Sequence, residues 1–366
     1  MIYLNVAGLS PFNQAVQKEV SATLEQFSRL LYSDEGIQHY RQTLQRCRQN
    51  LAQWLQVEDA QRIAFVPNAT TASSLVLSRI HWKSEDHVLT TTHENSTVLK
   101  EILALQPQGV QIHRLDHSSP AEFEAEIEQL LKTTHVRAIV ISHVSHIDGR
   151  MFPIERLYQL TQKYHALLIV DGAQAVGHIP VDFQDWQPDA YFFPGHKWCA
   201  GPMGTGALIL GDGWGKTIGR PDQREDFRDD SQPWWTRFEL GTQNIGLVAG
   251  FAKACTLKKQ EGLKTAVMEK IREAVRKELS NVPELRILEW DGPHSPGILS
   301  LTSQVKQTEG PLQSESHEIS WKTFQLPNNQ DQSGIRLSWS SATSQSDIES
   351  LLTFFQNMNR ENREHA

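Results

Sequence analysis

A series of short apolar runs, separated by stretches of helical pattern, constrains the fold of this chain more than any other feature. Runs such as RAIVISHV and ALLIVDG are apolar at nearly every position, whereas a strand with one solvated face alternates apolar and polar residues. Strands of this kind lie in parallel sheets that helices cover on both faces. The sequence therefore predicts an α/β fold with a mainly parallel sheet, whose strands are expected at residues 63–66, 87–92, 110–115, 137–144, 166–172, 190–195 and 206–210.

Two amphipathic helices are expected before the sheet begins. Apolar residues recur at helical spacing in both, which places them on one face of each helix. The first face carries Val16, Val20, Leu24, Phe27 and Leu31, and the second carries Tyr40, Leu44, Cys47, Leu51 and Leu55. The second pattern indicates that Cys47 is a core residue and not a reactive thiol.

The length of 366 residues suits two lobes better than one. We expect an N-terminal segment at 1–14 near the active site and the small domain, a large domain at 15–250, and a small C-terminal α/β domain at 251–366. Strands of the small domain are expected in GILSLTS and IRLSWS. The polar stretch 214–237 is expected to form a long loop, and residues 303–318, rich in Gln, Ser and Glu, are expected to be loosely ordered.

Composition and charge exclude several classes of protein. The formal net charge of -8 argues against nucleic acid or an anionic membrane as the main partner. The three cysteines form no C-x-x-C pair, so neither a metal site nor a disulfide framework is expected. The first residues have no basic region followed by a long apolar stretch, and no run is long enough to cross a membrane. A cytoplasmic location is therefore expected.

Two residues that follow apolar runs carry the first chemical signal. Asp171 ends the run LLIVD, and in an open parallel sheet ligands bind at the carboxyl ends of the strands. An aspartate there could equally cap a turn. Lys197 follows the apolar run AYFFP, and Phe192, Phe193 and Trp198 surround it with apolar side chains. Such surroundings lower the pKa of a lysine amine and favour imine formation.

The order of these motifs resembles the class V aminotransferase family of pyridoxal-phosphate (PLP) enzymes. The resemblance rests on a strand followed by Asp-x-x-Gln, then Gly-His-Lys, then Gly-Pro-x-Gly-x-Gly, and it extends from YLNVAGLSP to IRLSWS. It implies PLP fold type I, the aspartate-aminotransferase-like fold, with a large domain and a small C-terminal domain. It also implies a PLP cofactor held as a Schiff base on Lys197, with Asp171 on the pyridine nitrogen.

Further roles follow from the resemblance, residue by residue. His93 matches the histidine that stacks on the pyridine ring, and Gln174 the residue that hydrogen-bonds the phenolic oxygen. The phosphate would contact Ala69, Thr70 and Thr71 at a helix N-terminus, His196, and Thr242 from the neighbouring subunit of a homodimer. Arg336 matches the arginine that binds the substrate α-carboxylate. Read from the residues alone, Asn68 and the residues after it could be a simple helix cap, and Arg336 a surface residue on an edge strand.

The chain departs from the family pattern at three places. Cysteine desulfurases carry a nucleophilic cysteine shortly before the carboxylate-binding arginine, and the stretch from Gly292 to Arg336 has none. His146 stands where the family often has Asn, so it either tunes the cofactor and substrate or points away. Pro194 replaces a Ser or Thr before Gly-His-Lys, which removes one phosphate donor. The stretch LQSESHEIS is a poor helix where the family has a substantial one.

The resemblance and the missing cysteine together favour a C–S lyase that acts on cysteine- or cystine-type amino acids by α,β-elimination. The alternatives are a class V aminotransferase, an amino-acid epimerase, a persulfide-forming cysteine desulfurase, and a relative without catalytic function. A Rossmann dehydrogenase is disfavoured because no Gly-x-Gly-x-x-Gly follows the first strand, and the glycines at 201, 204 and 206 precede a strand instead of a helix.

Overall fold

The computed structural model describes residues 2–11, 13–31, 33–211, 234–282, 285–303, 319–326 and 329–364. The stretches predicted to be irregular lie largely outside this description. Of 214–237, only the short helix η4 (Trp234–Arg237) is described, and of 303–318 only residue 303, at the end of a strand. Most of LQSESHEIS, the stretch predicted to be a poor helix, is outside it as well.

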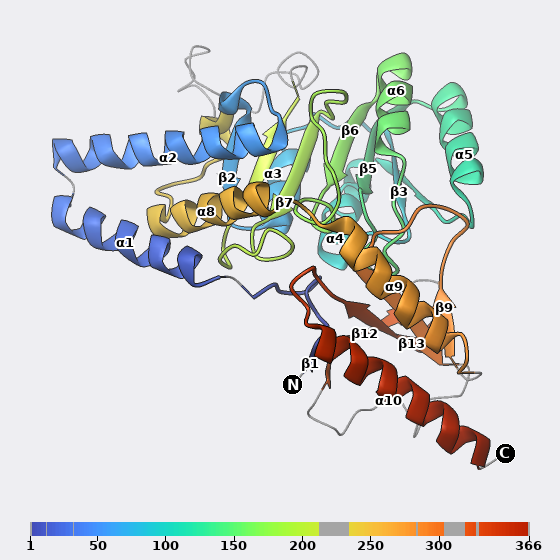
Figure 1. Ribbon diagram of the computed structural model, residues 1–366. Coiled ribbons are helices and arrows are strands. Elements are labelled where there is room, and N and C mark those ends of the chain that lie inside the picture. Colours follow the sequence, from blue (N-terminus) through green and yellow to red (C-terminus); the bar gives the residue numbers. More distant parts are fainter. Residues whose placement is uncertain are drawn as a thin grey trace.

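A sheet of seven strands forms the centre of the large lobe (Figure 1). Its order is β2 (Ile63–Val66), β8 (Gly206–Leu210), β7 (Ala190–Pro194), β6 (Leu167–Asp171), β5 (Val136–Ser142), β3 (His87–Thr91) and β4 (Gln111–Leu115). From β7 to β4 every pairing is parallel, and β8 pairs antiparallel with both β2 and β7. The mainly parallel sheet predicted from the apolar runs is therefore confirmed, with each strand within two residues of its expected ends.

Helices cover both faces of this sheet, which explains why its strands are apolar on both sides. One face packs against residues of α2 (Asp34–Leu55), α5 (Pro120–Thr133), α6 (Ile154–Tyr164) and α8 (Ile245–Glu261). The other face packs against α3 (Ala69–Leu77) and α4 (Ser96–Leu103). The short helices η1 (Ala60–Arg62) and η2 (Gln106–Gln108) precede β2 and β4.

The two predicted amphipathic helices differ in how much of their apolar face is covered. In α2, Leu44, Cys47, Leu51 and Leu55 are all buried, as expected. In α1 (Gln14–Leu30), Val16 is buried, whereas Leu24 is 42% exposed and Leu31, just past the helix, is 66% exposed. Helix α1 packs along α8, and its buried residues are Val16 and Thr23.

The small lobe is built on an antiparallel sheet with the strand order β12 (Lys322–Leu326), β13 (Asn329–Ser338), β10 (Ile298–Ser303) and β9 (Leu285–Leu288). Helices α9 (Thr265–Leu279) and α10 (Gln345–Glu364) supply residues to its core. The N-terminal strand β1 (Ile2–Tyr3) pairs with β11 (Ile319–Ser320), and Asn5 bridges to Ser338. The start of the chain thus lies on the small lobe, while the proposed division after residue 250 falls within α8.

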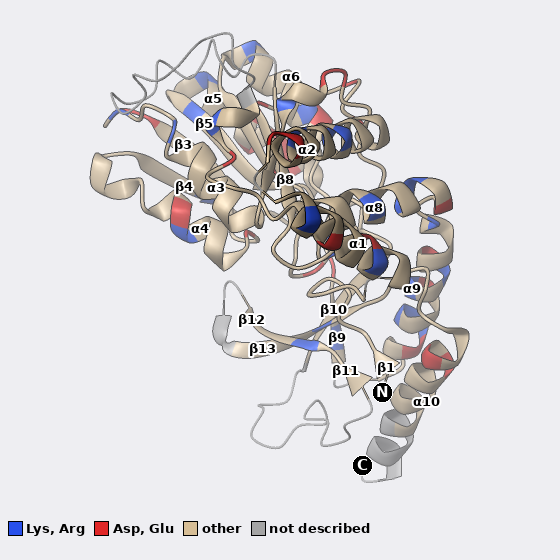
Figure 2. Ribbon diagram, turned by 90° about the vertical axis from the view of Figure 1, so that its left-hand side faces the viewer, with Lys and Arg blue, Asp and Glu red and all other residues tan. Residues whose placement is uncertain are grey.

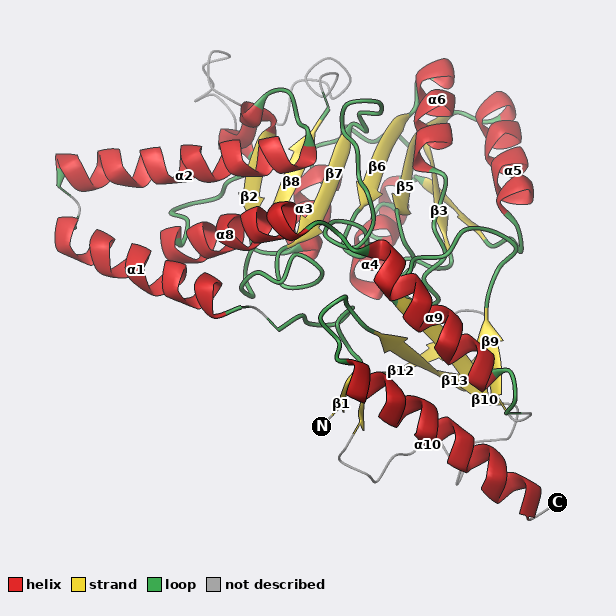
Figure 3. Ribbon diagram, viewed as in Figure 1, coloured by secondary structure: helices red, strands yellow, loops and turns green. Residues whose placement is uncertain are grey.

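Loops fill the space between the central sheet and the small lobe (Figure 3). Charged residues of both signs lie along the outer helices α1, α8 and α9 (Figure 2). None of the described helices combines the length and the apolar character that a membrane crossing requires. Ligands of open parallel sheets bind at the carboxyl ends of the strands, so a binding site is expected where these strand ends face β13 across the loops.

Candidate active site

Three charged side chains from distant parts of the sequence meet at the carboxyl ends of the parallel strands. Asp171 is the last residue of β6, and Lys197 follows shortly after β7, the strand that pairs with β6. Arg336 lies on β13 of the small lobe. The charges of Asp171 and Arg336 both act on the Lys197 amine, so the two lobes enclose one site.

The amine and the carboxylate of this site are both perturbed by burial. Burial lowers the pKa of Lys197 to about 8; Asp171 opposes the shift, and Arg336 adds to it. Burial raises the pKa of Asp171, while Lys197 and a hydrogen bond from the Ala173 N–H, 2.8 Å from Oδ1, oppose that shift. An amine with a lowered pKa is partly neutral near pH 7, and a neutral amine can attack a carbonyl or accept a proton.

A tight turn after β7 holds Lys197 in place. The Gly201 N–H donates to the Gly195 carbonyl and the Ala200 N–H donates to the Lys197 carbonyl, each at 2.8 Å. A Cβ atom on Gly195 would lie 2.3 Å from Thr205 Oγ1 and 2.7 Å from the Phe251 ring, so a larger residue fits there only if these side chains are displaced. The lysine backbone is therefore fixed by hydrogen bonds on both sides of its side chain.

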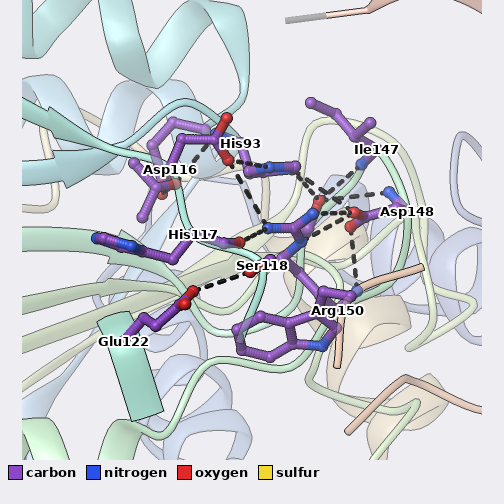
Figure 4. Close-up of polar contacts among 12 residues, drawn as sticks. His93, Asp116, His117, Ser118, Glu122, Ile147, Asp148 and Arg150 are labelled. Atoms are coloured by element: carbon purple, nitrogen blue, oxygen red, sulfur yellow. Dashed lines mark hydrogen bonds and ion pairs between the residues drawn. The ribbon is translucent and has the colours of Figure 1, made fainter. Parts of the chain in front are cut away.

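His93, just after β3, lies between Asp116, which follows β4, and Asp148, in the loop after β5 (Figure 4). Its Nε2 atom is 3.3 Å from Asp116 Oδ1, and its Nδ1 atom is 3.5 Å from Ser145 Oγ and 3.8 Å from Asp148 Oδ2. Arg150 binds Asp148 through Nε and Nη2, both at 2.8 Å. The orientation of the His93 ring is therefore set by the protein, as a stacking residue requires.

Arg336 is bound at one edge and open at the other. Its two terminal nitrogens donate to the His146 carbonyl at 2.7 Å and to Asn5 Oδ1 at 3.2 Å. The side chain is buried, and burial lowers its pKa to about 10, against the effect of Tyr3. A guanidinium group has five N–H donors, so these two contacts leave donors for a carboxylate.

The His146 imidazole is close enough to Lys197 and Arg336 for both of their charges to act on it. Burial lowers its pKa to about 3, and the charges of Arg336 and Lys197 add to that effect. The imidazole is therefore neutral at neutral pH, so it can give or accept a hydrogen bond but carries no charge. Burial, followed by the charge of Lys197, also lowers the pKa of His196.

Three buried nitrogens at the site have no hydrogen-bond partner within the described part of the chain: His146 Nδ1, His196 Nδ1 and Arg336 Nε. Buried polar atoms are normally paired, so their clustering here indicates room for a polar ligand. The amine of Lys197, the carboxylate of Asp171 and these nitrogens are the groups that a phosphorylated, nitrogen-containing aldehyde requires. The residues present thus fit the cofactor that the resemblance implies.

The N-terminus of α3 combines a helix cap with free donors. The Asn68 side chain accepts from the Thr71 N–H at 2.8 Å, as in an ordinary cap. The N–H groups of Ala69 and Thr70, in the first turn, have no partner within the helix and can bind an anion. The Thr70 hydroxyl is 2.9 Å from the Thr97 hydroxyl at the start of α4.

Gln174 is engaged with protein atoms at both ends of its amide. Its Nε2 atom donates to the Ala7 carbonyl at 3.1 Å, and its Oε1 atom accepts from the Trp198 indole at 2.6 Å. One Nε2 hydrogen has no partner among the described contacts, which leaves a donor for the role that the resemblance implies. Pro194, the departure before Gly-His-Lys, is the buried last residue of β7 and supplies no N–H donor.

The model of the family "Aminotransferase class-V" matches residues 2–311. The chain belongs to the class V aminotransferase family. The resemblance stated from the motifs is thereby confirmed.

Curated relatives of this class V chain are named as desulfurases. A probable cysteine desulfurase of Aeropyrum pernix is 26% identical over 272 residues, which is 68% of this chain and 65% of the relative. The cysteine desulfurase of Klebsiella pneumoniae is 28% identical over 232 residues, 59% of this chain and 56% of the relative. The chain thus spans less than two thirds of the length of the relatives it matches.

Solved structures match over almost the whole chain. A complex of the cystine C–S lyase C-DES with its reaction product cysteine persulfide has a TM-score of 0.83 at 23% identity and covers 96% of both chains. The apo cysteine desulfurase of Thermococcus onnurineus has a TM-score of 0.84 at 20% identity, covering 98% of this chain and 95% of that one. These likenesses confirm the predicted aspartate-aminotransferase-like fold.

The cysteines of this class V chain are all in the core. Cys47, Cys199 and Cys255 are buried and free. Burial raises the pKa of Cys47 to about 12 and that of Cys255 well above its usual value. Cys199 Sγ contacts the Val176 carbonyl at 3.5 Å. A buried thiol with a raised pKa is a poor nucleophile, as the sequence led us to expect.

Some residues at the site were not anticipated from the sequence. Asn5 binds Arg336, Asp148 faces His93, and Glu94 is buried behind His93. Asn5 is in the N-terminal segment that the family motif includes, so a signal for it existed. Glu94 gave no such signal, since it stands three residues after the end of β3 in the polar stretch TTHENST. Thr242 is exposed in the turn before α8 and has no described contact with the other site residues.

Proposed function

We propose that the protein is a PLP-dependent enzyme that acts on cysteine- or cystine-type amino acids and breaks their Cβ–S bond by α,β-elimination. The observation that carries the proposal is the meeting of Lys197, Asp171 and Arg336 at one site between the lobes. Membership of the class V family and the likeness to a cystine C–S lyase support it. A neighbour solved with glycine covalently linked to the PLP cofactor supports the choice of cofactor.

The residues that would hold the cofactor surround Lys197. Its amine would bind the aldehyde carbon, and Asp171 would keep the pyridine nitrogen protonated. His93 would cover one ring face, with its orientation fixed by Asp116 and Asp148. The α3 N-terminus with Thr70, together with His196, would bind the phosphate. When bound, PLP supplies an aldehyde that bonds to amines and a ring that delocalises the electron pair left at Cα.

Arg336 would orient the amino acid through its α-carboxylate. The guanidinium group is fixed at one edge by the His146 carbonyl and Asn5, so its remaining donors point in one direction. The neutral imidazole of His146, beside Arg336 and Lys197, would bind a polar group of the substrate without adding charge. Binding in this way would place the Cα–H bond next to Lys197.

Lys197 would remove the Cα proton once its amine is released. Its pKa of about 8 suits a general base near neutral pH. The Cβ–S bond then breaks, and its electron pair leaves with the sulfur. With cystine, the balanced reaction consumes one water and releases pyruvate, ammonia and cysteine persulfide.

The cysteines favour elimination over a persulfide on the enzyme. No cysteine lies between Gly292 and Arg336, and the three that exist are buried in the large lobe. A cysteine desulfurase, an aminotransferase and an epimerase share the same first proton transfer, so they stay as the competing outcomes. A non-catalytic relative would have no use for an amine with a lowered pKa beside an arginine open at one edge.

The distinguishing experiment supplies PLP-loaded protein with L-cystine, L-cysteine, or L-alanine plus 2-oxoglutarate. Elimination predicts pyruvate and sulfane sulfur from L-cystine in equal amounts, without any acceptor. Glutamate from the third mixture would favour the aminotransferase instead. Sulfur retained on the protein would favour the desulfurase, and loss of optical activity without pyruvate would favour the epimerase.

We further propose that the active unit is a homodimer in which Thr242 reaches the phosphate of the neighbouring site. The exposure of Thr242 and the 64% exposure of its neighbour Leu240 support this arrangement. Sedimentation of the PLP-loaded protein tests it. Mixing Lys197→Ala with Thr242→Ala protomers would restore one complete site per dimer if the threonine acts across the interface.

A further inference from the structure

A second carboxyl group is buried behind the proposed site. Glu94 follows His93 at the end of β3, and it is only 4% exposed. Its two oxygens each accept a hydroxyl group at 2.6 Å, from Thr91 on β3 and from Ser142 on β5. Glutamate is almost never buried without partners, and here a single side chain ties two neighbouring strand ends together.

These contacts connect Glu94 to both His93 and Asp171. The Thr91 hydroxyl that donates to Glu94 also accepts the main-chain N–H of His93 at 3.1 Å. Ser142 is the register partner of Asp171 in the β5–β6 pairing, and the next residue, His143, donates its N–H to the Asp171 carbonyl at 2.9 Å. Besides the peptide bond that they share, Glu94 is thus linked to His93 through the Thr91 hydroxyl, and it is linked to the end of β6 at Asp171 through Ser142.

We propose that Glu94 is a positioning residue that fixes the separation between His93 and Asp171 by holding the ends of β3 and β5 together. The inference rests on the proposed function for the roles of His93 and Asp171. Nothing in the class V motifs quoted above includes this glutamate. Its effect is exerted through Thr91 and Ser142, because it does not itself bind Lys197 or Arg336 in the described contacts.

The surroundings of Glu94 also give it a distinctive titration. Burial raises its pKa to about 7, and the charge of Asp171 on β6 adds to the shift, while the Ser142 and Thr91 hydrogen bonds oppose it. The groups that face it on β3 and β5 are hydroxyls, which do not titrate in this range, and beyond Asp171 lies Lys197. The Glu94 carboxyl thus loses its proton near neutral pH in the folded protein, and near the ordinary pKa of glutamate in the unfolded chain.

The first test compares turnover of the PLP-loaded Glu94→Ala and Glu94→Gln variants. Alanine removes both anchors, so the Glu94→Ala variant is expected to lose roughly ten- to a hundredfold in kcat with a smaller change in KM. Glutamine can keep both contacts, because one hydroxyl can rotate to accept its N–H, so it is expected to restore most of kcat. A folded Glu94→Ala variant with the kcat of the unchanged protein would overturn the proposal.

The second test uses the cofactor-free protein, so it stands even if the proposed function fails. Between pH 4.5 and 7 the folded protein binds a proton on Glu94 that the unfolded chain has lost, so stability falls as the pH rises. Glu94→Gln removes that loss. The urea midpoint of the variant minus that of the unchanged protein is therefore expected to increase between pH 5 and pH 8. Glu58→Gln, at an exposed position, serves as the matched control and should show no such rise.

The outcomes separate the two claims. If the urea midpoints of the Glu94→Gln variant and the unchanged protein differed by the same amount at every pH, the assignment of Glu94 as a buried carboxyl that titrates near neutral pH would be overturned. Protein that binds no PLP but shows the expected midpoint shift would overturn the proposed function and keep the assignment of the Glu94 carboxyl. Rescue of kcat by glutamine together with the midpoint shift would establish the positioning role.

Discussion

The guanidinium group of Arg336 donates to the main-chain carbonyl of His146 at 2.7 Å, joining residues 190 positions apart in the sequence and one on each lobe. The contact fixes one edge of the guanidinium, and the Asn5 side chain fixes another donor at 3.2 Å. The substrate-binding edge is therefore oriented before a ligand arrives. Preorganised donors of this kind contribute to binding because they need not be reordered.

Replacing Arg336 by Lys is expected to raise KM for amino-acid substrates by at least about tenfold, with a smaller effect on kcat. Lysine cannot form the paired contacts that a planar guanidinium makes with a carboxylate. Steady-state kinetics with L-cystine measure both parameters. Arg286→Lys, at an exposed position in the same sheet, is the control and should leave both unchanged; an unaltered KM in Arg336→Lys would place the carboxylate site elsewhere.

The rate at which cofactor-free protein binds PLP should depend on pH through Lys197. The amine must be neutral to attack the aldehyde, and its pKa is lowered to about 8. The rate constant is therefore expected to rise from pH 6 to pH 8 and to level off above that. Stopped-flow absorbance measures it, and a rate still climbing steeply toward pH 10 would show that the amine has an ordinary pKa.

Cystine turnover should survive the removal of every thiol. Because Cys47, Cys199 and Cys255 are buried, a variant with alanine at all three positions is expected to be less stable but to keep its kcat when folded. Circular dichroism establishes that the variant is folded before turnover is assayed. Loss of turnover in the folded variant would restore the persulfide mechanism.

The ion pair of Arg48 and Glu239 should matter for stability. The guanidinium of Arg48 is buried, contacts Glu239 and lies 3.8 Å above the Trp235 ring, while Glu239 also accepts the Phe65 N–H at 2.8 Å. Arg48→Met leaves an unpaired buried carboxylate and is expected to lower the free energy of unfolding by about 3–5 kcal/mol. Chemical denaturation measures it.

A surface pair provides the control for that prediction. Arg29 pairs with Glu25 on α1, and both side chains are largely exposed. Arg29→Met is expected to change the free energy of unfolding by less than about 1 kcal/mol. If Arg48→Met and Arg29→Met lowered the free energy of unfolding equally, burial of the Arg48–Glu239 pair would contribute nothing to stability.

The sequence predicted the central strands well because their apolar runs record burial on both faces, as in RAIVISHV and ALLIVDG. It also predicted Lys197, Asp171 and Arg336 as site residues, because each of them matches a residue of the class V motifs. Their meeting across two lobes is a property of the folded chain, and only the structure shows it. Motif spacing says nothing about contacts between β13 and the loop that carries His146.

Other features could not be predicted from local sequence. Glu94 looks like a surface residue in TTHENST, since the Ser142 hydroxyl that makes its burial tolerable is 48 positions away. The Asp116, Asp148 and Arg150 contacts around His93 likewise join separate loops (Figure 4). Leu24 on α1 and Leu31 just past it are exposed, although the apolar side of an amphipathic helix is usually covered by the same chain.

The measurement that tests the central claim most directly is the covalent attachment of PLP. Protein loaded with PLP is reduced with borohydride, digested and analysed by mass spectrometry. A pyridoxyl adduct is predicted on the Lys197 peptide. It should be absent in Lys197→Ala and retained in Lys258→Ala, a variant of another lysine whose pKa burial lowers. An adduct on a different lysine, or none at all, would contradict the assignment of Lys197 and the catalytic account built on it.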